Sequence, residues 1–125
     1  MQTILLIESD PAALVAQSLV LRCFGYAVLE AGSRDEAWRA CVEHVGTIHL
    51  ILTEAILEKE SSIEFVGRIQ LLYPRINALF LSDASSAELA DRQCVPCEYA
   101  FLRKPFRADA LADTIRELLE DPKTC

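Results

Sequence analysis

Residues Ile4–Pro11, ILLIESDP, join an unbroken apolar run to an acidic cluster and a proline. Four consecutive branched aliphatic residues are typical of a strand that is buried on both faces, as in a parallel sheet. Asp10 then fits a helix N-cap, and Pro11 fits the first helical position, where its missing N–H is not needed. The segment therefore predicts a strand whose carboxyl end carries polar residues and leads directly into a helix.

The same alternation continues through the rest of the chain. Further apolar runs predict four more strands, at Tyr26–Leu29, Ile48–Leu52, Ile76–Leu81 and Tyr99–Leu102. Helical patterns lie between and after them: one from Pro11 that ends at Gly25, one that begins at a capping box of Ser33 and Glu36, one with the inward stripe Phe65, Val66, Ile69 and Leu72, a short one near Ser86–Arg92 and one with the stripe Leu111, Ile115, Leu118 and Leu119. Five strand–helix units with short connections predict an α/β fold with helices on both faces of a parallel sheet.

Length and charge exclude several classes of protein. A chain of 125 residues has room for one domain, which we expect to span residues 1–120 and to be followed by a short tail at 121–125. The net charge of -7 argues against binding to nucleic acid, which needs a basic stripe. No apolar run approaches the ~18 residues that a membrane helix needs, and no basic segment marks an export signal, so we expect a cytoplasmic protein with no membrane contact.

Polar residues follow the predicted strands at one edge of the sheet. Glu8, Ser9 and Asp10 follow the first strand, Glu54 follows the third, and Ser82 and Lys104 end the fourth and fifth. Ligand sites in open parallel sheets lie at the carboxyl ends of the strands. Carboxylates, a hydroxyl and an ammonium should therefore surround one crevice.

With these residues, the chain resembles the response-regulator receiver (CheY-like) family over nearly its whole length. Lys104-Pro105-Phe106, with Phe101 three residues before the lysine, looks like the family's final-strand signature, and Ile4–Pro11 looks like its opening strand and acidic cluster. Ser82 stands where the family keeps Ser or Thr, and Glu54 stands where it keeps the phospho-accepting aspartate. The resemblance implies a doubly wound, flavodoxin-like (βα)5 fold with strand order 2-1-3-4-5, and a non-enzymatic role in two-component phosphorelay signalling.

The resemblance also implies a chemistry for the crevice. In the family, two acidic residues after the first strand and the acceptor aspartate hold a divalent cation through oxygen ligands. A lysine and a hydroxyl then bind the phosphoryl oxygens, and their movement switches a surface of the domain.

This chain departs from the family at several of these positions. Glu54 is one methylene longer than aspartate, and an error of ~1 Å in the position of a reacting group can cost on the order of a hundredfold in rate. Ser9 replaces one carboxylate of the acidic pair, while Asp10 occupies the helix N-cap and points elsewhere. Mg²⁺ binding should then be weak, with Glu8 as the remaining ligand. Further departures are Glu58 and Ser62, in place of the family's proline and glycine, and Cys97-Glu98, in place of Gly-Ala.

These departures together predict a pseudo-receiver that keeps the fold, is not phosphorylated at Glu54 and has no catalytic residue or cofactor. Glu54 could pair with Lys104 either as a structural ion pair or as an imitation of part of the phosphorylated state. One alternative is a receiver that still accepts a phosphoryl group with Mg²⁺. Another is a redox switch through Cys94 and Cys97, although ordinary reduced thiols are expected in a chain with five scattered cysteines. A flavin-binding protein of the same fold is disfavoured, because the acidic turn at Glu8 would repel the phosphate.

The first predicted helix offers a surface for a partner. Its inward stripe is expected to be Ala13, Ala16, Val20 and Phe24, which leaves Leu14, Val15, Leu19 and Cys23 exposed on an adjacent face. An exposed apolar strip often marks an interaction site. By resemblance to the family, the partner would be a histidine kinase or another signalling protein, and a homodimer is the alternative.

Overall fold

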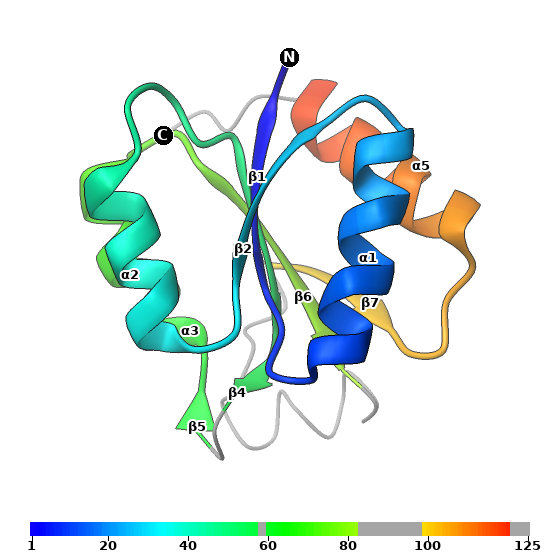
Figure 1. Cartoon of the computed structure of the whole chain (residues 1–125), viewed down its shortest axis with the longest axis horizontal. Helices are drawn as coiled ribbons and strands as arrows, with labels where there is room; N and C mark the ends of the chain where they lie inside the picture. The colour runs from blue at the N-terminus through cyan, green and yellow to red at the C-terminus, as the bar shows by residue number, and fades with distance from the viewer. Residues whose placement is uncertain (58–59, 83–98, 121–125) are drawn as a thin grey trace.

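A five-stranded parallel sheet forms the centre of the molecule (Figure 1), in a computed structural model that describes residues 1–57, 60–82 and 99–120. Its strands are β1 (Thr3–Ile7), β2 (Ala27–Ala31), β3 (Leu50–Glu54), β6 (Asn77–Ser82) and β7 (Ala100–Arg103), and their order is β2-β1-β3-β6-β7. Because β6 and β7 are the fourth and fifth strands of this sheet, the predicted flavodoxin-like order 2-1-3-4-5 is confirmed. Two short strands after β3, β4 (Ile56–Leu57) and β5 (Glu60–Ser61), pair with each other in antiparallel fashion.

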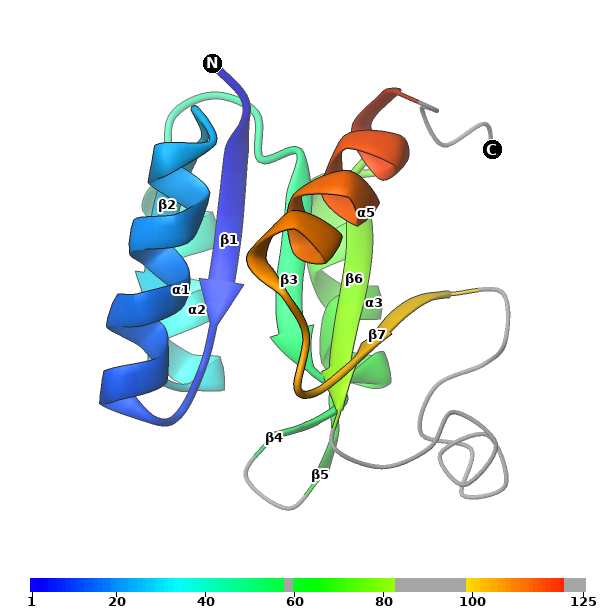
Figure 2. The ribbon, with the colours of Figure 1, turned by 90° about the vertical axis from the view of Figure 1, so that its right-hand side faces the viewer.

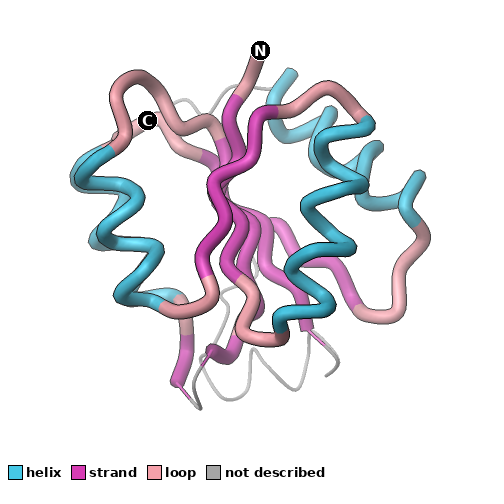
Figure 3. The backbone as a smooth tube through the Cα atoms, in the orientation of Figure 1, coloured by secondary structure: helices cyan, strands magenta, loops and turns pink. Residues whose placement is uncertain are grey.

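Helices cover both faces of the sheet (Figures 2 and 3). The helices α1 (Pro11–Cys23) and α5 (Ala108–Glu120) lie on one face, and α2 (Arg34–Glu43) and α3 (Ile63–Leu72) lie on the other. Two hydrophobic clusters result, one between the sheet and each helical layer. None of the helices in the described part of the chain is both long and apolar enough to cross a lipid bilayer.

The alternation of side chains along β1 explains why its sequence is apolar throughout. Ile4 and Leu6 pack in the cluster under α1 and α5, whereas Leu5 and Ile7 pack in the cluster under α2 and α3. Side chains on a strand point to opposite faces in turn, so a strand that is covered on both sides has no position for a polar residue. The central strand β3 repeats the arrangement, with Leu50 and Leu52 on one side and Ile51 on the other.

The inward face of α1 differs from the prediction. Leu21 and Ser18 are buried, and Leu14 packs against the cluster on that side of the sheet, whereas Ala16 and Phe24 are exposed. The predicted inward stripe of α1 is misplaced because Ser18 is polar, and a polar residue does not indicate a core position. In the fold, the hydroxyl of Ser18 accepts a hydrogen bond from Nε of Arg22 at 3.1 Å, which satisfies its oxygen.

The predicted helix starts and stops agree with the structure in part. Ser33 caps α2, because its hydroxyl accepts a hydrogen bond from the backbone N–H of Glu36 at 3.2 Å. Asp10 is the N-cap residue of α1, but its side chain makes no capping hydrogen bond. Leu72, predicted to point inward, is exposed at the end of α3. The helix predicted near Ser86–Arg92 lies outside the described residues.

Two glycine substitutions should change stability in opposite directions. Gly25 ends α1 with a φ of 93°, and a β-carbon there would contact no atom within 4 Å, so Gly25→Ala adds only backbone strain. We expect this change to lower the free energy of unfolding by about 1 kcal/mol.

Gly67 lies inside α3 and also has nothing within 4 Å of an added β-carbon. Gly67→Ala should therefore raise the free energy of unfolding by up to about 1 kcal/mol. Urea unfolding of both variants is the measurement, and shifts of the same sign would contradict this account.

Candidate functional site

Three charged side chains meet at the carboxyl ends of the sheet. Glu8 follows β1 directly, Glu54 is the last residue of β3, and Lys104 follows β7. The parallel register aligns these ends, since Ile7 lies beside Thr53, and Glu54 lies beside Leu81. Residues that are far apart in the sequence are thereby brought to one point.

Lys104 lies between the two carboxylates. Its Nζ is 3.6 Å from Oε1 of Glu8 and 3.8 Å from Oε1 of Glu54. Glu8 is only 2% exposed, while Lys104 and Glu54 are half-buried. We call these three residues the lysine–carboxylate cluster. The ion pair between Glu54 and Lys104, which the sequence left as a possibility, is present in the structure.

One ammonium does not neutralise two carboxylates, and the pKa of Glu8 reflects this. Burial raises the pKa of Glu8 to about 7, helped by a hydrogen bond with Glu54 and by the charge of that neighbour. Lys104 acts in the opposite direction and lowers this pKa, but its effect is smaller. Oε2 of Glu8 is buried and has no hydrogen-bond partner among the described residues. Near neutral pH the cluster therefore carries a proton on Glu8 for part of the time.

The backbone around the cluster holds Lys104 in place. The N–H of Lys104 donates to the carbonyl of Ser82 at 2.8 Å, which continues the pairing of β6 with β7 past the end of the strand. Phe101, on β7, packs against the cluster of apolar side chains under α2 and α3. The peptide bond between Lys104 and Pro105 is cis. Of the predicted positions, Phe101 and Pro105 thus lie on the segment that carries Lys104, and Ser82 lies on the neighbouring strand β6.

Ser62 has a structural role that the sequence did not indicate. Its side chain is fully buried, and its hydroxyl donates to the carbonyl of Glu54 at 2.7 Å. Its backbone N–H donates to the carbonyl of Ala55 at 2.9 Å. Its φ of -83° is one that any residue adopts, so no glycine is needed here. The departure at Ser62 therefore ties the beginning of α3 to the end of β3 and fixes the backbone of Glu54.

Other residues singled out in the sequence lie outside the cluster. Ser9 and Asp10 are exposed at the turn into α1, and Asp10 forms no ion pair with Lys104 in the described part of the chain. Glu58, Cys94, Cys97 and Glu98 are not among the described residues, so the altered loop and the cysteine pair stay predictions.

The lysine–carboxylate cluster offers a divalent cation less charge than the site that the family resemblance implies. Mg²⁺ usually keeps several waters and is held by one or two carboxylates. Here both carboxylates face the ammonium of Lys104, and Ser9 contributes no charge, so these residues fit such a cation poorly. Within the described ranges, no group of three or more His, Cys, Asp or Glu side chains is arranged to hold a metal.

Comparison with known proteins relates this arrangement to a fold. No protein-family profile matches the chain. Over 118 residues it is 27% identical to the sensor kinase CckA of Brucella abortus, covering 94% of this chain but 12% of that protein. The other curated relatives are transcriptional regulators, of which it spans about a quarter, 24% and 26%.

Solved structures agree over the whole domain. A response-regulator receiver domain from Clostridium thermocellum matches with a TM-score of 0.79 and 24% identity, covering 96% of this chain and 95% of that one. The receiver domain of the hybrid histidine kinase CckA matches with a TM-score of 0.75 and 24% identity, over 92% of this chain and 96% of that one. The chain therefore has the fold of response-regulator receiver domains.

The proton on Glu8 gives the stability of the domain a defined dependence on pH. The pKa of Glu8 rises from 4.5 to about 7 on folding, so the folded state binds more protons than the unfolded chain between these values. The contribution of Glu8 is present below pH 4.5 and is lost as the pH rises through about 7. Glu8→Gln, which cannot ionise, should be more favourable relative to the unsubstituted protein at pH 8 than at pH 5, by on the order of 2 kcal/mol.

Urea unfolding at the two pH values measures this difference. Glu117→Gln, an exposed carboxylate on α5, is the control and should show no such difference between pH 5 and pH 8. An equal effect of Glu8→Gln at both pH values would show that Glu8 is ionised throughout.

Proposed function

We propose that the chain is the receiver domain of a two-component phosphorelay signalling protein, is not phosphorylated at Glu54 and acts by binding other proteins. The observation that carries the proposal is the position of Lys104, whose ammonium lies between Glu8 and Glu54. The receiver fold and the likeness to CckA, a sensor kinase, support the signalling context.

The contacts of Glu54 argue against phosphoryl acceptance. An acceptor carboxylate has to be free to attack in line, with a cation to neutralise the incoming charge. Oε1 of Glu54 is instead directed to Lys104 at 3.8 Å, and its backbone carbonyl is fixed by Ser62. The neighbouring carboxyl, Glu8, also faces Lys104 and is protonated for part of the time near neutral pH. These contacts support a site that does not accept a phosphoryl group.

The surface of α1 supports the second part of the proposal. Val15 is 58% exposed and Leu19 is 60% exposed, one helical turn apart, so they form an apolar strip. Leu14, which was expected to belong to this strip, packs inward and is not part of it. Next to the strip is a groove of about 520 Å³ between α1 and the segment from Lys104 to Ala108.

This groove extends from α1, beside the apolar strip, to Lys104 of the lysine–carboxylate cluster. Its apolar walls come from Ala16 and Val20 on α1 and from Pro105 and Phe106 after β7, and Lys104 lines it as well. A partner that binds α1 and inserts a side chain here would contact the segment that holds Lys104. By likeness to the family, that partner is a histidine kinase or another signalling protein, and self-association is the alternative.

Acetyl phosphate separates the proposed function from a working receiver. After incubation with acetyl phosphate and Mg²⁺, we expect the intact mass of the protein to remain unchanged, because Glu54 is engaged with Lys104 and Mg²⁺ is expected to bind weakly. Intact-mass spectrometry is the measurement. A stoichiometric gain of one phosphoryl group that disappears in Glu54→Gln would overturn the proposal.

The double variant Ser9→Asp/Glu54→Asp is the matched comparison. It returns both acidic positions to the family's residue types, so it should gain Mg²⁺ affinity, measured by calorimetry, relative to the unsubstituted chain. Equal Mg²⁺ affinity in both proteins would show that these two positions do not explain the loss of the site.

A charge on the apolar strip should weaken partner binding. Val15→Glu places a carboxylate in the middle of the strip, where desolvation opposes docking, so the affinity for a histidine-kinase phosphotransfer domain should fall tenfold or more, a loss of about 1.4 kcal/mol. Leu19→Glu should act in the same direction. Isothermal titration calorimetry measures the affinity, and sedimentation velocity measures self-association.

Val45→Glu is the control for these substitutions. Val45 is 93% exposed and follows α2, on the opposite side of the sheet from α1, so the chemical change is the same at a different surface. A partner affinity that falls equally in Val45→Glu, or in none of the three variants, would rule out α1 as the docking surface.

A further inference from the structure

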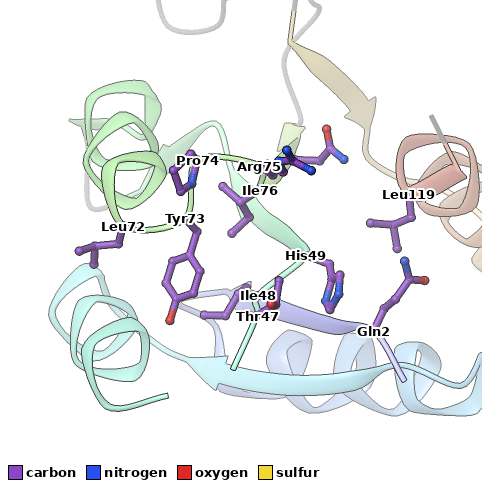
Figure 4. Close-up of a pocket in the computed structure, with 11 residues that line it drawn as sticks. Gln2, Thr47, Ile48, His49, Leu72, Tyr73, Pro74, Arg75, Ile76 and Leu119 are labelled. Atoms are coloured by element: carbon purple, nitrogen blue, oxygen red, sulfur yellow. The ribbon is translucent and has the colours of Figure 1, made fainter. Parts of the chain in front are cut away.

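A second hollow lies at the opposite end of the sheet from the lysine–carboxylate cluster. It has a volume of about 470 Å³ and is bounded by the segment before β3, the connection from α3 to β6 and the end of α5. We call it the amino-end pocket, because β3 and β6 begin there. Figure 4 shows Leu72 and Tyr73 at one side of it, His49, Gln2 and Leu119 at the other, and Ile76 between them.

Hydrogen bonds across the fold hold the walls of the pocket. The backbone N–H of Thr3 donates to Nδ1 of His49 at 3.0 Å, and the side-chain amide of Asn77 donates to the carbonyl of Leu118 at 3.0 Å. The hydroxyl of Tyr73 donates to the carbonyl of Cys41 at 2.8 Å. Each bond joins a lining residue to a different element, so the pocket is formed before any ligand binds. A pre-formed pocket loses less conformational entropy on binding.

The lining combines an apolar body with donors and a positive charge. Ile48 and Ile76 are buried at its base, and the ring of Tyr73 and the side chain of Leu119 add apolar walls. Because Nδ1 of His49 accepts a hydrogen bond, the neutral ring carries its hydrogen on Nε2, which is left as a donor. The exposed guanidinium of Arg75 supplies a cation at the rim.

The charge of the pocket contrasts with that of the chain. Asp and Glu number 19 in the sequence, yet none of the eleven described residues that line the pocket is acidic. The end of α5 contributes partial negative charge through its last carbonyls, but the amide of Asn77 satisfies that of Leu118. The volume lies within the range of about 300–1,000 Å³ that is typical of small-molecule sites.

We propose that the amino-end pocket binds a small amphipathic carboxylate, with a flat apolar body between Tyr73 and Leu119 and the carboxylate toward Arg75. The carboxylate accepts from the guanidinium, and the Nε2–H of His49 is a second donor within the pocket. This site is separate from the proposed function, because none of its lining residues belongs to the lysine–carboxylate cluster or to the strip on α1. Its test therefore stands whatever the outcome of phosphorylation.

A titration with 3-phenylpropionate, followed by amide chemical shifts in two-dimensional NMR of the full chain, tests the proposal. We expect saturable shifts confined to residues near positions 2–3, 47–49, 72–77 and 119. The uncharged 3-phenylpropanamide should bind about tenfold more weakly, because it offers no charge to Arg75. The absence of saturation, or shifts centred on another surface, would overturn the proposal.

Arg75→Gln tests the role assigned to the charge. This variant should bind the carboxylate and the amide with nearly equal affinity, since the guanidinium is what distinguishes them. Arg107→Gln removes the same charge at the other end of α5, outside the pocket, and should retain the tenfold preference. A preference that survives in Arg75→Gln, or is lost equally in both variants, would show that Arg75 does not recognise the carboxylate.

Discussion

The placement of one ammonium between two carboxylates is the constraint on which the rest of the site depends. Glu8 is buried beneath the turn that follows β1, where an unpaired charge would be costly. Lys104 compensates the charge of Glu8 only in part, because it also pairs with Glu54. Near neutral pH, Glu8 is therefore protonated for part of the time. The cluster is therefore a three-member unit in which a change at Glu54 or Lys104 alters the pKa of Glu8.

The sheet makes this unit, because the parallel register sets the ends of β1 and β3 side by side and brings the end of β7, which pairs with β6, to the same edge of the sheet. Two hydrogen bonds then fix the end of β3: the hydroxyl of Ser62 donates to the carbonyl of Glu54, and the N–H of Ala55 donates to the carbonyl of Leu81. With its backbone fixed on both sides, Glu54 has little freedom except in its side chain. That side chain is directed toward Lys104.

The sequence predicted the sheet well, because burial on both faces demands unbroken apolar runs such as Ile4–Ile7, and their short length favours strands over buried helices. It left open whether Glu54 touches Lys104, because the direction of a side chain at the end of a strand depends on the folded site. It failed on the inward face of α1, where Ser18 is buried although it is polar. Nε of Arg22 donates a hydrogen bond to the hydroxyl of Ser18, a contact that only the folded chain reveals. The roles of Ser62 and of the amino-end pocket escaped for the same reason: both depend on hydrogen bonds between elements whose distance in space no local pattern records.

The two ends of the sheet are chemically different, and the difference follows from which groups are left unsatisfied there. At the carboxyl end, Oε2 of Glu8 is buried and has no hydrogen-bond partner among the described residues, so a hydrogen-bond donor is what it lacks there. At the amino end, Nε2–H of His49 and the guanidinium of Arg75 are donors in a pocket lined by no described acid, so the unmet need is for an anion. A domain without phosphoryl chemistry at the carboxyl end of its sheet would still have two sites with opposite binding preferences, joined by the strands of the sheet. Since β3 connects them directly, with His49 just before it and Glu54 at its end, a ligand at the amino end and a partner at the carboxyl end would act on the same element.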